Sequence, residues 1–136
     1  MNTSKFDPVM IELVLLINRM GYKTRGSCSG HDPKSRKDFY ESFGRYKDRD
    51  HSLTISKFVK DRVISDGEDG QVWFKKPSHA KWFYLKIKEL SQSKFKSRIK
   101  MTTKIHVVFI CNGLTQKTID NFWRDITVKF KKEEFL

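Results

Sequence analysis

The stretch Ser27-Cys28-Ser29-Gly30-His31 carries the residue types and spacing best suited to chemistry in this sequence. Two hydroxyls, a thiol and an imidazole follow one another here, with glycines at positions 26 and 30 and Arg25 just before them. Glycine-rich turns allow consecutive backbone N–H groups to converge on an anion. We therefore predict a loop that binds a phosphate group through Arg25, Ser27, Cys28, Ser29, Gly30 and His31.

The same stretch is compatible with structural or metal-binding roles. Short Ser/Gly loops commonly form tight turns in which the serines satisfy their own backbone. Cys28-x-x-His31 has the spacing of a zinc-ligand pair, but it stands alone, and a set would need other donors from His51, His106 and Cys111. A disulfide between Cys28 and Cys111 is disfavoured in a reducing compartment. We predict no metal site and no bound cofactor.

A third alternative is nucleophilic catalysis by Cys28. This chemistry would require His31 to face back across the turn and a carboxylate to orient it, for which Asp32 is the nearest candidate. No carboxylate pair, acidic metal cluster or Ser-His-Asp ordering supports a hydrolase or a phosphoryl transferase. We predict binding rather than catalysis, and we assign no catalytic residue.

The region around this loop resembles a known family. A helix ending at Ile17-Asn18, then Tyr22-x-Thr24, then Ser27-Cys28-Ser29-Gly30, is similar to the Ser-Cys-Ser-Gly signature of the tRNA wybutosine-synthesising protein 3 family. Members of that family methylate a hypermodified guanosine in tRNA with S-adenosylmethionine, so the resemblance implies a ligand-facing loop and a phosphate-rich partner. The displaced Thr24 and the presence of His31 after the glycine depart from the family pattern. The loop also resembles that of small bacterial and phage proteins with a Gly-Tyr-x-Thr-x-x-Ser-Cys-x-Gly-His sequence.

The charge balance points to an anionic partner. Lys and Arg number 28 against 16 Asp and Glu, giving a formal net charge of +12. The segment from Lys75 to Lys104 holds ten basic residues and one acidic residue, Glu89, and so carries +9 of this charge. A lysine-rich surface can serve solubility alone, whereas a one-sided cluster attracts phosphate-bearing ligands.

Aromatic side chains alternate with lysines in the middle of this basic segment. Exposed aromatics between cations can stack nucleic-acid bases while ammonium groups hold phosphates. Trp82 and Phe83 are expected to pack inward, since a helix between other elements needs a wide apolar face. We predict that Lys81, Tyr84 and Lys88 contact the ligand.

Periodicity and turn signals predict one α+β domain over residues 1–136, with about three helices on one face of a mainly antiparallel sheet. Helices are expected from Pro8 to about Gly21, from Pro77 to about Leu90, and after a Thr115 cap. A long surface excursion is expected at about 32–50. Strands are expected at 22–24, 52–58, 72–74 and 99–110.

These patterns restrict the class of protein. No apolar run is long enough to span a membrane, the first residues do not resemble a secretory signal, and two cysteines make no disulfide framework. We expect a cytoplasmic protein that binds RNA or a soluble nucleotide; by analogy, a small phage protein could sequester a host signalling nucleotide in this way. The alternatives are an RNA-modifying enzyme similar to tRNA methyltransferases, and an interaction module that inhibits an acidic host protein.

Overall fold

Helices and strands are described for residues 8–32 and 69–134 in a computed structural model of the chain. The predicted strand at 52–58, and the predicted excursion at 32–50 apart from Asp32, lie outside these residues. In chain order the elements are α1 (Pro8–Arg19), β1 (Thr24–Cys28), β2 (Gly70–Phe74), α4 (Pro77–Leu90), α5 (Ser93–Lys96), β3 (Ile99–Thr103), β4 (His106–Phe109) and α6 (Gln116–Glu134).

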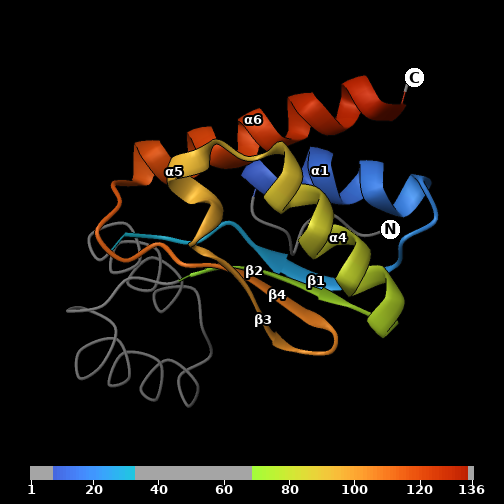
Figure 1. Cartoon of the computed structure of the whole chain (residues 1–136). Coiled ribbons are helices and arrows are strands. Elements are labelled where there is room, and N and C mark those ends of the chain that lie inside the picture. Colours follow the sequence, from blue (N-terminus) through green and yellow to red (C-terminus); the bar gives the residue numbers. More distant parts are fainter. Residues whose placement is uncertain (1–7, 33–68, 135–136) are drawn as a thin grey trace, which may run out of the picture.

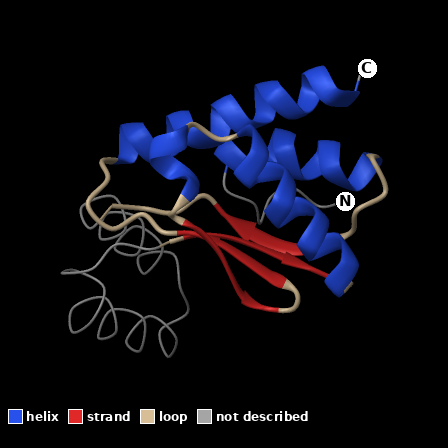
Figure 2. Ribbon diagram, viewed as in Figure 1, coloured by secondary structure: helices blue, strands red, loops and turns tan. Residues whose placement is uncertain are grey.

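The four described strands form one antiparallel sheet in the order β1-β2-β4-β3. The helices lie on one side of this sheet (Figures 1 and 2), so the predicted α+β class is confirmed. Because side chains alternate along a strand, one face of the sheet meets the helices and the other faces away. Buried residues such as Val72, Phe74 and Phe109 belong to the helix-facing set, while Trp73 and His106 belong to the outer face.

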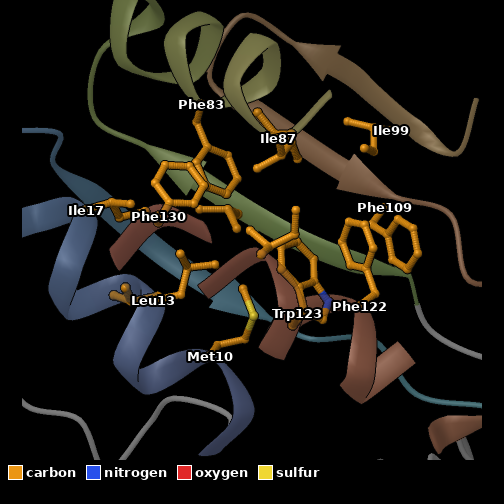
Figure 3. Close-up of a cluster of buried hydrophobic side chains, with 14 of the residues drawn as sticks. Met10, Leu13, Ile17, Phe83, Ile87, Ile99, Phe109, Phe122, Trp123 and Phe130 are labelled. Atoms are coloured by element: carbon orange, nitrogen blue, oxygen red, sulfur yellow. The ribbon is translucent and has the colours of Figure 1, made fainter. Parts of the chain in front are cut away.

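The core is built mainly from aromatic and branched side chains of α1, α4, α6 and the sheet (Figure 3). Phe109 of β4 stacks on Phe122 of α6 with ring centroids 3.8 Å apart, and Trp123 meets both rings edge-on. Burying each such side chain stabilises the fold by about 1.5–3 kcal/mol. Helical spacing predicts inward positions in all three helices, and Leu90 and Met20 among them are only partly buried. The others are buried, namely Met10, Leu13, Val14, Ile17, Ala80, Phe83, Ile87, Ile119, Phe122, Trp123 and Ile126.

The expectation of a single strand over 99–110 is wrong, because the segment folds into the β3–β4 hairpin. The chain turns at Lys104 and Ile105, where the Ile105 N–H donates to Thr103 Oγ1 at 3.3 Å. This turn contains no Gly, Pro, Asn or Asp, so the residues that usually mark a turn are absent. The β-favouring residues on both sides therefore look continuous in the sequence.

The position predicted for the first strand is also wrong. β1 runs from Thr24 to Cys28, so Arg25, Ser27 and Cys28 lie in a strand rather than in a loop. The backbone of Gly26–Cys28 pairs with Gln71–Trp73 of β2, and the register shifts at Arg25. Pairing with a distant strand overrides the local preference of Gly and Ser for turns. The loop itself begins at Ser29.

Local signals at the helix ends are borne out. Gly21 adopts a φ of 103° directly after α1, a conformation that glycine reaches without a steric penalty. Pro77 opens α4 and Leu90 ends it, and the Thr115 hydroxyl accepts a hydrogen bond from the Thr118 N–H at the start of α6. Within residues 8–32 and 69–134, no helix combines the length and apolar character that crossing a membrane requires.

Candidate functional site

The loop after β1 is fixed to the N-terminal half of α6. The Trp123 indole N–H donates to the Ser29 carbonyl at 2.6 Å, and Gln116 Nε2 donates to the Gly30 carbonyl at 3.1 Å. In return, the Asp32 N–H donates to Gln116 Oε1 at 2.9 Å, and Asp32 Oδ2 accepts from the Gln116 backbone N–H at 2.8 Å. A carboxylate at a helix N-terminus stabilises the helix, so Ser29–Asp32 anchors α6 to the end of β1.

Gly30 adopts a φ of 97°, a conformation that glycine reaches without a steric penalty. The two hydroxyls of the stretch are both buried. Ser29 is fully buried, and Ser27 Oγ lies on the helix-facing side without a hydrogen-bond partner in the described structure. The conformation therefore turns both hydroxyls away from solvent, and their role as ligand contacts remains a prediction.

Cys28 and His31 do face each other, with 3.9 Å between the Cys28 Sγ and His31 Nδ1. Neither Cys28 nor Cys111 is in a disulfide, and burial raises the pKa of the Cys111 thiol to about 12. No group of three His, Cys, Asp or Glu donors is assembled among residues 8–32 and 69–134. His51 lies outside those residues, and His106 bonds to neighbouring strand side chains on the outer face of the sheet.

Three of the ten basic residues between Lys75 and Lys104 are used within the fold. Lys86 bridges to Glu133 at 3.1 Å and to Glu89 at 3.5 Å, and its pair with Glu133 raises the Lys86 pKa. Lys96 donates to backbone carbonyls at the end of α4. Arg98 donates to the carbonyls that follow β4, at 3.0 and 2.7 Å. These three side chains hold structure together and offer little to a ligand.

The aromatic residues of α4 differ in how deeply they are buried. Phe83 is fully buried, and the half-buried Trp82 stacks on Tyr22 with ring centroids 3.5 Å apart, so inward packing is confirmed for both. Tyr84 is half-buried beside the core, with the Lys88 ammonium 5.3 Å from its ring centroid. Lys81 is exposed.

Five exposed cations gather at one end of the sheet. The strand register brings together the start of β1, the end of β2 and the β3–β4 turn. The Lys75 N–H donates to the Lys23 carbonyl at 3.0 Å, which places these two residues directly opposite each other. We name this set the basic edge, and it consists of Lys23, Arg25, Lys75, Lys76 and Lys104, all of them exposed.

No acidic side chain lies in β1, β2, β3 or β4. The described acidic residues lie in α1, α4 and α6, or at Asp32 and Asp69, beyond the strand ends away from the basic edge. Helix cations are paired with several of them, as in Arg19–Glu134 at 2.9 Å and Lys129–Asp125 at 3.0 Å. No ion pair within the described part of the chain involves the basic edge. The described carboxylates therefore leave its positive charge uncompensated.

The predicted site residues do not meet in one place. Arg25 belongs to the basic edge, and Lys81 lies in the first turns of α4 at the same end of the sheet (Figure 1). Cys28–His31 lies at the opposite end, beside the start of α6. With about 3.3 Å per strand residue, Arg25 and Cys28 are about 10 Å apart. Tyr84 and Lys88 lie farther along α4.

The outer face of the sheet carries an aromatic pair next to the basic edge. The rings of Trp73 and His106, on neighbouring strands, stack with centroids 4.5 Å apart and planes 7° from parallel. His106 Nδ1 lies 2.6 Å from Thr102 Oγ1, and His106 Nε2 lies 2.9 Å from Gln71 Oε1. Burial lowers the His106 pKa. These contacts suit a neutral imidazole that donates from Nε2 and accepts from Thr102.

A hollow of about 420 Å³ opens beside this pair, lined by Arg25, Gly26 and Trp73. Gly26 is the β1 partner of Trp73, and because it lacks a side chain, no described side chain covers that side of the indole. The sequence predicts Trp73 in a strand but gives no sign of this site. Strand alternation around Trp73 was the available signal, but the partner strands had to be known before His106 and Gly26 could be placed beside it.

Comparison of the chain with protein-family models, curated proteins and solved structures finds no match. The function of this chain must therefore be inferred from its own residues.

Proposed function

We propose that this protein binds a phosphate-bearing ligand, RNA or a nucleotide, through the basic edge. The observation that supports it most directly is the segregation of charge. Five exposed cations are clustered at one end of the sheet, whose described strands contain no acidic residue, whereas the described acidic residues lie in the helices or beyond the other end of the strands, and four helical cations are paired with them. A one-signed cluster of this kind raises the local concentration of anions and accelerates their association.

The proposal assigns a different part to the Ser29–Asp32 loop. Its carbonyls accept hydrogen bonds from Trp123 and Gln116, and the Asp32 carboxylate occupies the N-terminus of α6. These contacts support a structural role for the loop, which attaches the end of β1 to α6 and so fixes the position of this edge strand. The phosphate contacts are assigned to Lys23, Arg25, Lys75, Lys76 and Lys104.

The test is the salt dependence of binding to a fluorescein-labelled single-stranded RNA of about 12 nucleotides, followed by anisotropy. Between about 50 and 200 mM salt, wild-type affinity should fall steeply, because bound phosphates release counterions. The triple variant K75Q/K76Q/K104Q should bind more weakly, and its log–log salt slope should be smaller by about two, since each lost phosphate contact removes about 0.7.

A matched control removes the same charge from another surface. Lys117, Arg124 and Lys132 are exposed residues of α6, and K117Q/R124Q/K132Q should keep wild-type affinity. Equal losses in the two triple variants would mean that net charge alone attracts the RNA. That result, or wild-type protein that binds neither this RNA nor inorganic polyphosphate, would refute the proposal.

A further inference from the structure

We infer that the hollow lined by Arg25, Gly26 and Trp73 is a stacking site for a nucleobase, and that the ligand is a single-stranded nucleic acid. The inference rests on the proposed function, because the basic edge must hold the phosphates beside the base. It adds the chemical class of the ligand and a site on the outer face of the sheet.

The geometry of the indole supports a planar partner. Trp73 has the His106 imidazole on one side, nearly parallel at 7°, and the side-chain-free Gly26 position on the other. Neighbouring strands lie about 4.8 Å apart, which is close to the 4.5 Å between the ring centroids of Trp73 and His106. A base above Gly26 would therefore extend the series of His106 and Trp73 by one more ring.

The residues that line the hollow leave room for a base. A Cβ added to Gly26 would lie 3.8 Å from Trp73 Cε3, so a side chain there would occupy the space beside the indole. Arg25 is exposed and also lines the hollow, and a guanidinium can stack on a base or pair with a phosphate.

The surroundings of Trp73 favour nucleic acid over an acidic protein segment. Thr102 and Gln71 hold the imidazole in place, so the ring pair is rigid before any ligand binds. An acidic peptide would need cations but no flat aromatic surface. Among the described residues that line the hollow, Arg25 is the one polar side chain, which predicts stacking that tolerates any base.

Two probes separate stacking from charge, namely a labelled single-stranded oligonucleotide and inorganic polyphosphate, which has phosphates but no bases. Trp73→Ala should lower affinity for the oligonucleotide by about 10- to 100-fold, the range expected for one lost stacking contact. It should leave polyphosphate binding unchanged. Trp73→Phe, which keeps an aromatic ring, should recover most of the oligonucleotide affinity.

Gly26→Val provides a second test that does not depend on how the tryptophan variant folds. Valine is favourable in a strand, and its methyl groups would fill the hollow, so oligonucleotide affinity should again fall while polyphosphate binding persists. Oligo-dT, oligo-dA and their RNA counterparts should bind with similar affinities, and each should quench the Trp73 fluorescence that Trp73→Phe lacks.

The outcomes distinguish this inference from the proposed function. If folded Gly26→Val and Trp73→Ala bind the oligonucleotide like wild type, the stacking site is overturned even though the basic edge still binds phosphate. If K75Q/K76Q/K104Q lowers the affinity for both probes while Gly26→Val lowers only the affinity for the oligonucleotide, the basic edge and the stacking site are both supported. If wild type binds neither probe, the proposed function fails first, and the stacking site fails with it.

Discussion

Gly70 at the start of β2 is a position where one methyl group should disturb the fold. A Cβ built there would lie 2.8 Å from the Ser29 carbonyl oxygen, 2.9 Å from Trp123 Cζ2 and 3.1 Å from Trp123 Nε1. The nearest atom is backbone, and the indole is buried, so neither neighbour can move aside cheaply. The Gly70→Ala variant therefore tests whether the contact between Ser29 and Trp123 is as tight as the structure describes.

The expected magnitude follows from two effects. Overpacking a core position costs about 1–3 kcal/mol, and loss of the 2.6 Å hydrogen bond from Trp123 to Ser29 adds about 1 kcal/mol or more because both groups are buried. We expect a loss of about 2–4 kcal/mol of unfolding free energy. For a chain of this size, this loss lowers Tm by roughly 10 °C.

Thermal denaturation followed by circular dichroism measures the effect, with Gly26→Ala as the matched control. Gly26 also lies in a strand, but its added Cβ would make only an ordinary 3.8 Å contact, so Tm should change by less than about 2 °C. Hydrogen exchange of the Trp123 indole N–H should be faster in Gly70→Ala alone. A Gly70→Ala protein that melts within about 2 °C of wild type would refute the close packing of this loop on α6.

Three further predictions concern single side chains. In native protein at about pH 8, Ellman's reagent should react with the half-buried Cys28. Cys111 should react only on unfolding, because burial raises the pKa of its thiol to about 12. A native Cys28→Ser protein that still reacts with the reagent would contradict this. His106 has a lowered pKa, so the unfolded state binds more protons at acid pH, and stability should decrease as pH falls below about 6.5. Urea titrations should show a weaker acid loss in His106→Gln, and equal pH profiles would disprove the assignment. Phe130→Ala should cost about 3–5 kcal/mol in urea unfolding, against less than about 0.5 kcal/mol for Leu85→Ala, because Phe130 is fully buried and Leu85 is 54% exposed.

The sequence predicts those parts of the fold that local interactions determine. The beginning and end of α4 at Pro77 and Leu90, the stop at Gly21 and the Thr115 cap depend on neighbours within one helical turn. The inward face of α6 follows from helical spacing.

The missed features depend on partners far away in the sequence. The residues around Gly26 do not predict a strand, because β1 is stabilised by pairing with β2 more than 40 residues later. The β3–β4 turn lacks turn-forming residues, and its hairpin is specified by sheet register and burial on the helical layer. The Trp73–His106 pair requires knowledge of both strands and of their faces, which one-dimensional patterns do not contain.

The strand order of the sheet also bears on how the chain acquires its structure. The β3–β4 hairpin closes over a two-residue turn, whereas β1–β2 pairing and the α1–α6 contact, with Arg19 and Glu134 separated by 115 positions, close very long loops. Loop-closure entropy delays contacts between distant segments. The hairpin and α4 are therefore the natural folding nucleus, and the docking of β1 and of α1 on α6 completes the structure late. Destabilising changes in these late contacts should chiefly accelerate unfolding and leave the folding rate nearly unchanged.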